Sequence, residues 1–309
     1  MDRWDRSHAA ELVSLTDLAL PGENLTGDDL VACLWEDDDP TVVFACPGGD
    51  AGPVADGAGA AGTAVGVAAA VARQVGDRRV GFVQLVAVAP AARRQGVGRR
   101  LMAAVEEWAF GEQLALSLQV GGAAPFYLWP GVDVHATAAL CFFEALGYHP
   151  TGSDLNMSFP TRHRAPVPAG VVIRRALEDH DAAAGLAFVG RLWPRWVAET
   201  RRAVEHGTCH LAFAGGEAQA GASAVVGFGC HSVNRLGWLG PMGTDPDRRH
   251  AGLGNALLGA IATDLMAAGL ESVEVSWVGP LGFYANAAGA TVSRAFRGYG
   301  LSRRARASA

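Results

Sequence analysis

Apolar residues follow two kinds of pattern along the chain: short runs typical of buried strands, and stripes at i, i+4 and i+7/8 typical of amphipathic helices. In the first half a strand-like run over 79–88 precedes a helix whose stripe starts at Val97, and another strand follows over 114–120. The second half repeats this order, with a strand over 236–244, a helical stripe from Leu253 and a strand over 272–278. The pattern therefore predicts two α/β domains that are built alike.

A polar segment over 161–170 holds two prolines and interrupts both periodicities, which is typical of a linker. We therefore expect an N-terminal domain over 1–160 and a C-terminal domain over 171–309. The first half is predicted to contain a helix over 8–19, a strand over 41–45 and a Gly- and Ala-rich loop over 47–62. For the second half we expect a strand over 171–175, helices over 178–190 and 194–206, and strands over 208–214 and 225–233.

The segment between strand and helix occurs twice in the chain, once in each half. It reads VAPAARRQGVG from Val88 to Gly98 and TDPDRRHAGLG from Thr244 to Gly254. Four of its residues recur 156 positions later, where Pro246, Arg249, Gly252 and Gly254 repeat Pro90, Arg93, Gly96 and Gly98. A late helix and glycine turn, 143–148, also recurs as 284–290. Two copies in one strand–loop–helix setting carry more weight than a single short glycine motif.

The composition of this loop is that of an anion site. Gly96 and Gly98 allow a phosphate to approach unpaired backbone N–H groups at the positive end of a helix. Arg93 and Arg94 add positive charge beside the loop, although the net charge of the protein is −6. The expected ligand is a pyrophosphate or another polyanion.

Composition and spacing exclude several other chemistries. All 25 basic residues are Arg, so a Walker-type phosphate loop and a lysine Schiff base both lack their Lys. The dinucleotide fingerprint requires a small residue where Leu101 and Leu257 stand. The negative net charge argues against broad nucleic-acid binding, which depends on neutralising phosphates.

At these residues the chain resembles the GNAT (Gcn5-related) N-acetyltransferases. Their acyl-CoA signature is R/Q-x-x-G-x-G/A after a strand, usually preceded by V-x-P. Both loops match this signature, and the second loop departs from it only in having Thr244 at the Val position. The resemblance implies an α/β fold with an α+β mixed sheet, as two GNAT-type acyl-CoA N-acyltransferase domains in tandem. It also implies acetyl-CoA as co-substrate, with its pyrophosphate on residues 94–99 and 250–255 and its pantetheine along the preceding strand. The residues expected to bind it are Val86, Ala87, Val88, Arg93, Arg94, Gln95, Gly96, Val97, Gly98 and Arg99, and in the second half Met242, Gly243, Thr244, Arg249, His250, Ala251, Gly252, Leu253, Gly254 and Asn255.

The family's reaction is direct attack of an amine on the thioester, which needs a proton acceptor and an acid for the leaving thiolate. In many members the acid is a Tyr of the late helix. Tyr284 stands there in the second half, whereas the equivalent Phe143 cannot donate a proton. We therefore expect Tyr284 to be the general acid, the alternative being a packed core aromatic. The strands before the loops lack a carboxylate, so His231 or Glu274 is the candidate base, although each is more often structural.

An insertion in the first half joins aromatic residues to a carboxylate. Tyr127 and Trp129 precede Asp133, and such a set suits an amine or sugar-like acceptor. The alternative is that Trp129 fills a hydrophobic gap between the two halves.

Two Cys-His pairs, Cys209-His210 and Cys230-His231, raise the question of a zinc site. Neighbours on a strand point to opposite faces, so at most one residue of each pair could face a shared site. We therefore expect no metal. The five cysteines are widely spaced without a CxxC pair, and the N-terminus lacks an apolar signal region. Both features favour a cytoplasmic location.

The predicted function is acetyl-CoA-dependent N-acetyltransfer to a primary amine of a small-molecule or peptide acceptor. One alternative is a non-catalytic acyl-CoA-binding or regulatory module, favoured by Phe143 and the missing strand carboxylates. Another is a mycothiol-synthase-like acetyltransferase, which shares the tandem build and length. A peptidoglycan aminoacyl-transferase is weaker, because those proteins lack a coenzyme A loop. We expect no nucleic-acid or membrane partner, and a monomer or homodimer.

Overall fold

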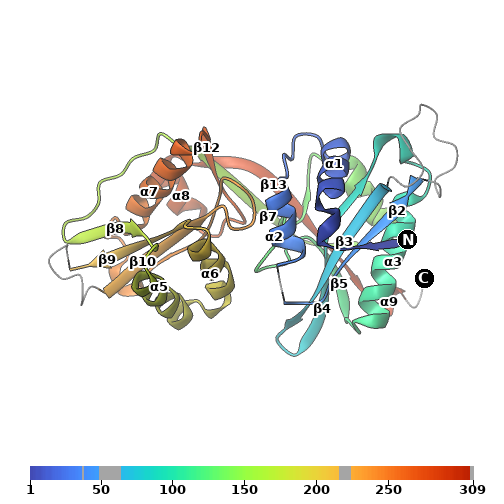
Figure 1. Cartoon of the computed structure of the whole chain (residues 1–309), viewed down its shortest axis with the longest axis horizontal. Helices are drawn as coiled ribbons and strands as arrows, with labels where there is room; N and C mark the ends of the chain where they lie inside the picture. Colours follow the sequence, from blue (N-terminus) through green and yellow to red (C-terminus); the bar gives the residue numbers. More distant parts are fainter. Residues whose placement is uncertain (37, 49–63, 216–223, 307–309) are drawn as a thin grey trace. The chain divides into compact units, whose positions relative to one another are not determined.

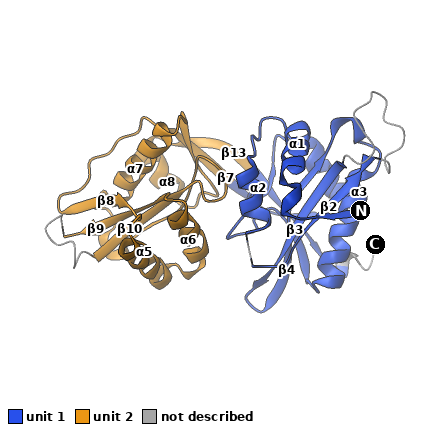
Figure 2. Ribbon diagram, viewed as in Figure 1, with its two compact units in different colours: residues 1–154, 296–309 blue, residues 155–295 orange. Residues whose placement is uncertain are grey.

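The structure, a computed structural model, describes residues 1–36, 38–48, 64–215 and 224–306 of the 309-residue chain. They form two compact units, shown in different colours in Figure 2. The first unit comprises residues 1–154 and 296–309, and the second unit comprises residues 155–295. Each is a mixed β-sheet with helices on both faces, which confirms the predicted α/β class with an α+β mixed sheet.

The first unit is built on a sheet in which β4 and β5 are parallel and the other paired strands are antiparallel. Its strand order is β1 (Asp2–Trp4), β2 (Thr41–Pro47), β3 (Ala64–Val75), β4 (Arg78–Val88) and β5 (Ser117–Val120), followed by parts of β13 (Thr291–Ser302) and β7 (His149–Pro160); β6 (Val132–Asp133) pairs with β13. Its helices are α1 (Ala9–Ala19), α2 (Gly27–Leu34), α3 (Val97–Glu107), α4 (Thr137–Ala145) and α9 (Arg303–Arg306), with 3-10 turns at Arg6–His8 and Pro90–Ala92 and a π-helical turn at Trp108–Glu112.

Both faces of this sheet are buried, because β3 and β4 send apolar side chains to each side. Leu12 of α1 and Leu30 of α2 pack on the face that carries Leu85. On the other face, Leu101 of α3 packs on Ala68 and other small residues of β3. The sequence pattern did not reveal β3, because a strand of Ala and Gly has low β-propensity. Its small residues serve close packing: a Cβ on Gly66 would lie 2.7 Å from Val97.

The second unit has the strand order β7, β12, β11, β10, β9, β8, with β11 and β12 parallel. Figure 1 shows α7 and α8 on one face of this sheet and α5 and α6 on the other. The elements are β8 (Val171–Arg175), α5 (Asp179–Leu192), a 3-10 turn at Pro194–Trp196, α6 (Val197–Glu205), β9 (Cys209–Ala214), β10 (Ala224–His231), β11 (Trp238–Thr244), a 3-10 turn at Pro246–Arg248, α7 (Leu253–Ala267), β12 (Ser272–Val275) and α8 (Leu281–Ala288).

Strands β7 and β13 each contribute to both units. The end of β7 pairs with β12 in the second unit, where Phe159 lies opposite Val273. The end of β13 pairs with β5 in the first unit, where Tyr299 lies opposite Val120. The last strand of the chain therefore completes the first sheet.

This connectivity differs from the division into 1–160 and 171–309 that the sequence predicts. A period-2 apolar pattern identifies a strand but not the strand with which it pairs. The segment 161–170 has no regular secondary structure, yet it packs along α7. The His163 ring nitrogen Nε2 lies 2.8 Å from the Asn255 oxygen, and a Cβ on Gly259 would lie 3.1 Å from the backbone nitrogen of Ala165.

The elements predicted around both loops are present, with small shifts at their ends. The strand predicted over 114–120 begins at Ser117, and the strand predicted over 272–278 ends at Val275. Most of the loop predicted over 47–62 lies outside the described residues. None of the described helices has the length and apolar composition needed to cross a membrane.

Candidate active site

The two repeated loops have the same backbone conformation. Each starts with a 3-10 turn opened by a proline and ends at a helix N-terminus. The angle φ is +63° at Arg94 and +64° at His250, and +80° at Gly96 and +81° at Gly252. The sequence repeat is therefore also a structural repeat, and Gly96 and Gly252 occupy the left-handed region that favours glycine.

Each loop presents the first turn of a helix to solvent. Gly96 and Gly252 are the N-cap residues of α3 and α7, and no side chain caps either helix. Both glycines are exposed, whereas Val97 and Leu253 directly after them are buried and anchor the helices. The first backbone N–H groups and the positive end of each helix dipole are therefore placed for an anion.

The second glycine of each loop has a packing role. A Cβ on Gly98 would lie 3.2 Å from the ring of Phe142 in α4, and one on Gly254 would lie 2.7 Å from the ring of Phe283 in α8. From the sequence, both glycines of the first loop were expected to allow a phosphate to approach the backbone. The structure adds a second reason at Gly98 and Gly254, because the late helix presses an aromatic ring against the loop.

The arginines of the first loop differ in whether their side chains bind other parts of the protein. Arg93 donates from Nε to the Val88 carbonyl at 3.0 Å and from Nη2 to the Ala19 carbonyl at 2.7 Å. Its guanidinium therefore links the loop to α1 by hydrogen bonds and is not directed to a ligand. Arg94 and Arg99 are exposed, and neither makes an ion pair with a described residue. These two arginines remain as the cationic groups of the predicted anion site.

The strand before each loop has an unpaired edge. Residues 80–83 of β4 pair with β5, but β4 continues to Val88 without a partner on that side in the described chain. In the second unit, β11 pairs with β12 only at Trp238 and Leu239 and continues to Thr244. Residues 86–88 and 242–244 therefore offer backbone N–H and C=O groups to an extended ligand with amide groups, as the pantetheine of coenzyme A has.

Each of these strands has a register break in its pairing with the strand on its other side, which is β3 for β4 and β10 for β11. In β4 the pairing passes from Val83 to Leu85, leaving Gln84 as the extra residue of a β-bulge. Its side chain is 4% exposed and donates to the Cys33 carbonyl at 2.9 Å. In β11 the pairing with β10 passes from Leu239 to Met242. Bulges bend a strand away from its neighbour, and this bending opens the edge.

Tyr284 lies in α8 beside Phe283, with their ring centroids 4.9 Å apart in an edge-to-face arrangement. Its side chain is 8% exposed, and burial raises the pKa of Tyr284 to about 12, because the phenolate would lose its hydration. No described residue makes a hydrogen bond with its hydroxyl. Tyr284 is therefore a neutral phenol whose proton is not engaged within the protein.

The equivalent position of the first unit is an apolar cluster. The Phe143 ring stacks on Tyr299 with centroids 6.1 Å apart and meets Tyr148 edge-on at 5.5 Å. The hydroxyls of these two tyrosines donate to Glu144 and Glu106, respectively. This helix position supplies no proton donor.

The two candidate bases lie in different surroundings. Glu274 of β12 accepts a hydrogen bond of 2.5 Å from Asn156 Nδ2, and Asn156 Oδ1 accepts from the Trp277 N–H at 2.9 Å. This group lies at the end of β12, where β11 and β12 separate. His231 instead turns toward His210 on β9, with ring centroids 5.8 Å apart, and so lies on the side of β10 away from that separation. Sequence reasoning missed Asn156, because it comes from β7, which had no predicted partner.

The predicted acceptor residues lie in the first unit, and each has a structural contact. The Trp129 indole N–H donates to Glu23 Oε2 at 2.9 Å, and its ring packs on the core beneath α1 and α2. Asp133 Oδ1 accepts from the His135 backbone N–H at 2.8 Å. Tyr127 is buried in the same unit.

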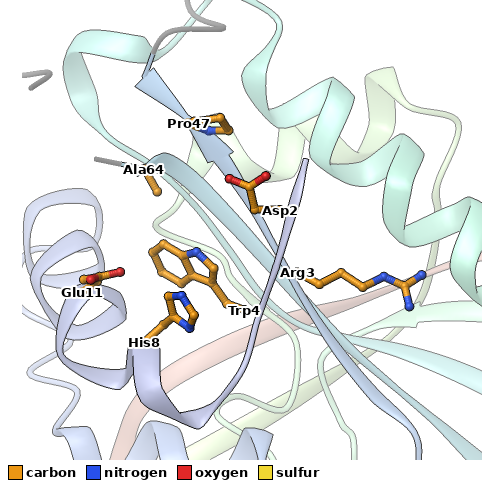
Figure 3. Close-up of a pocket in the computed structure, with 7 residues that line it drawn as sticks. All are labelled: Asp2, Arg3, Trp4, His8, Glu11, Pro47 and Ala64. Atoms are coloured by element: carbon orange, nitrogen blue, oxygen red, sulfur yellow. The ribbon is translucent and has the colours of Figure 1, made fainter. Parts of the chain in front are cut away.

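One pocket of the first unit contains none of the predicted site residues. It has a volume of about 390 Å³ and is lined by Asp2, Arg3, Trp4, His8, Glu11, Pro47 and Ala64. Figure 3 shows Trp4 and His8 side by side with Glu11 nearby, while Arg3 points away. Arg3 forms an ion pair with Glu112.

Comparison with known proteins identifies the class. Residues 22–148 match the family model for the acetyltransferase (GNAT) family, and no curated protein matches the chain. These residues are therefore a GNAT acetyltransferase domain. The second unit repeats the loop, and solved structures share the fold of both units, so the chain has the architecture of two GNAT-type domains in tandem.

Solved structures show the same fold over the whole chain, at identities that establish fold alone. A GCN5-related glucosamine N-acetyltransferase region of a fungal multi-domain GH3 β-N-acetylglucosaminidase is 19% identical with a TM-score of 0.72, over 97% of this chain and 38% of that one. A GCN5-related N-acetyltransferase from Sphaerobacter thermophilus is 19% identical with a TM-score of 0.62, over 97% and 94%. A tandem GNAT protein from the clavulanic acid biosynthesis pathway is 16% identical with a TM-score of 0.68, over 96% and 95%.

Proposed function

We propose that this protein is an acetyl-CoA-dependent N-acetyltransferase whose working site is in the second unit. The observation that carries the proposal is Tyr284: a buried, protonated phenol with an unengaged hydroxyl, in the unit whose loop and open strand edge suit an acyl-CoA. The acceptor class is a primary amine of a small molecule or a peptide.

The loop and the strand edge give acetyl-CoA two points of attachment. The N–H groups of the first turn of α7, with the exposed Arg249 beside them, bind the pyrophosphate. The unpaired edge of β11 over 242–244 takes the amides of the pantetheine. This attachment holds the thioester near the separation of β11 and β12 and so reduces the entropic barrier to attack.

The reaction needs two proton movements. The acceptor ammonium loses a proton, its nitrogen forms a bond to the acetyl carbon, and the carbon–sulfur bond breaks. Tyr284 donates its phenolic proton to the departing thiolate, so that neutral thiol leaves. Between the two candidate bases we favour Glu274, which lies where the strands separate, over His231, which turns away from that point.

The first unit is proposed to bind acetyl-CoA without turning it over. Its loop has the same dihedral angles and a similar open edge, but Phe143 replaces the acid. The alternative of a non-catalytic acyl-CoA-binding or regulatory module therefore applies to the first unit alone. We further propose a cytoplasmic, reducing setting, supported by five cysteines that are all free thiols.

Steady-state kinetics with a panel of amines tests the proposal. Tyr284→Phe should lower kcat by about 100-fold or more, the usual contribution of a general acid, and leave the KM for acetyl-CoA nearly unchanged. Tyr299→Phe is the matched control, because it removes a hydroxyl from the first unit and should leave kcat unchanged. Tight acetyl-CoA binding without turnover on any amine would instead establish the non-catalytic alternative.

A further inference from the structure

Three side chains of the second unit converge on the face of the sheet that α7 covers. His210 comes from β9, His231 from the end of β10 and Asp264 from α7, and their candidate ligand atoms all lie within 4.8 Å of one another. The Asp264 Oδ2 atom lies 3.0 Å from His210 Nε2 and 3.6 Å from His231 Nε2. Both histidines are buried, and Asp264 is only partly exposed.

His231 Nε2 is a buried polar atom without a hydrogen-bond partner among the described residues. Its distance of 3.6 Å from Asp264 Oδ2 is too long for a hydrogen bond. The other ring nitrogen, Nδ1, lies 3.1 Å from Ser232 Oγ. When Nδ1 carries the proton, it donates a hydrogen bond to Ser232 Oγ. The other nitrogen, Nε2, then presents a lone pair toward a carboxylate oxygen. Two such electron-rich atoms repel each other unless a cation lies between them.

We propose that His210, His231 and Asp264 form a binding site for one divalent transition-metal ion, of which Zn²⁺ fits best. Two imidazoles and one carboxylate are a known zinc ligand set, and Ser232 acts as the outer partner that orients a ligating histidine. With metal–ligand bonds of about 2.0–2.2 Å, tetrahedral ligand atoms lie roughly 3.3 Å apart. The separations of Asp264 Oδ2 from the two imidazole nitrogens, 3.0 and 3.6 Å, bracket that value, and all three ligand atoms lie within 4.8 Å of one another.

Asp264 has contacts in the described chain that a bound ion would change. Without a metal, His210 and Asp264 are within hydrogen-bonding distance, and Arg175 Nε approaches the same carboxylate oxygen at 3.7 Å. The ion would replace the contact between His210 and Asp264, and the half-exposed Arg175 could move aside.

The site would have a structural role. It joins β9, β10 and α7, so a bound ion would fix the helix whose N-terminus forms the second loop. Cys209 and Cys230 are adjacent on the opposite face, where burial raises the pKa of the Cys230 thiol. Only the histidine of each Cys-His pair faces the shared site, as strand geometry requires, and the expectation of no metal did not take Asp264 of α7 into account.

Isothermal titration calorimetry of the chelator-treated full chain with Zn²⁺ tests the site. We expect one ion per chain, and an affinity at least about tenfold weaker in His231→Asn and in Asp264→Asn. His149→Asn is the control, since His149 is an exposed histidine of β7. Co²⁺ should give the intense visible absorption of a tetrahedral nitrogen and oxygen site, without a thiolate charge-transfer band. The thermal midpoint should rise with Zn²⁺ in the original protein and stay constant in the two variants.

Three outcomes would overturn the proposal: no stoichiometric binding to the original protein, equal binding by the variants and the control, or a cobalt spectrum with thiolate bands. Circular dichroism of each variant shows whether it is folded. Asp264→Asn preserves the shape of the side chain, so a folded variant with weak binding separates the loss of a ligand from unfolding. Acetyltransferase activity is not part of the readout, so the metal site and the proposed function stand or fall independently.

Discussion

The hydroxyl of Tyr299 donates a hydrogen bond of 2.8 Å to Glu144 Oε1, and so joins β13, the last strand of the chain, to α4 in the first unit. Tyr299 is fully buried, and its ring stacks on Phe143. The first unit therefore depends on residues that follow the whole second unit in the chain.

This dependence predicts how the protein responds to division. Residues 1–160 expressed alone lack the part of β13 that pairs with β5, so an interior position of the sheet stays empty and core aromatics are exposed. We expect this fragment to be aggregated or partly folded, as judged by broad amide resonances and the absence of a cooperative thermal transition. A sharp, cooperative transition would contradict the prediction. A fragment over 1–160 joined by a short linker to residues 291–306 is the control and should fold.

The sequence could predict the loops because their determinants are local. Pro90, Arg93, Gly96 and Gly98 specify a turn and a helix start within eleven residues, and the second copy repeats them. Short apolar runs likewise located β4 and β11. The pairing of β13 could not be predicted, because its partner β5 lies far away in sequence and many partners satisfy one alternating pattern.

The site was predictable in part for the same reason. Tyr284 was proposed because the resemblance places a Tyr in the late helix, whereas Asn156 beside Glu274 depends on the pairing of β7 with β12. Arg93 carried the loop motif, but its side chain bonds to Ala19, a helix residue that the motif does not contain. Asp264 was not singled out, because the sequence does not show that this helix carboxylate lies beside histidines from two strands.

The second glycine of each loop should respond unequally to a methyl group. A Cβ on Gly254 would lie 2.7 Å from Phe283, closer than one on Gly98 would lie to Phe142, at 3.2 Å. Gly254→Ala should therefore lower the free energy of unfolding by about 1–3 kcal/mol, and Gly98→Ala by less. Chemical denaturation measures both values. Gly254→Ala combined with Phe283→Leu should regain stability if packing is the cause, and a double variant as unstable as Gly254→Ala would refute that cause.

Tyr284 should also determine part of the alkaline stability. Its pKa is 10.0 in an ordinary setting and about 12 in the folded protein, so the folded state holds its proton more tightly between these values. Stability is then fully present below pH 10 and falls as the pH rises toward 12, by roughly 3 kcal/mol in total. Because the chain has no Lys, few other groups titrate in this range. Denaturation at pH 9 and pH 11.5 should show a smaller loss for Tyr284→Phe, and equal losses would contradict the assignment.

The ion pair of Arg174 and Asp181 should govern stability at the acid end. Arg174 donates from Nε and Nη2 to the two Asp181 oxygens at 2.6 and 2.8 Å, and the Asp181 side chain is 2% exposed. The hydrogen bonds from Arg174 lower the pKa of Asp181 below its ordinary value of 3.8. The folded protein therefore gains stability from this carboxylate above that value and loses it as the pH falls through the lowered pKa.

Asp181→Asn should consequently reduce stability at pH 7 by about 1.5–3 kcal/mol, the range for hydrogen bonds to charged groups, because it removes one carboxylate acceptor while Arg174 keeps its charge. The difference from the original protein should shrink as the pH falls below 3.8, since the original protein then loses the same charge. Asp179→Asn is the matched control in the first turn of α5, because Asp179 is an exposed residue of the same helix start. Urea denaturation at pH 7 and at pH 3 gives both comparisons, and a difference that stays constant between them would show that the ion pair is not the source.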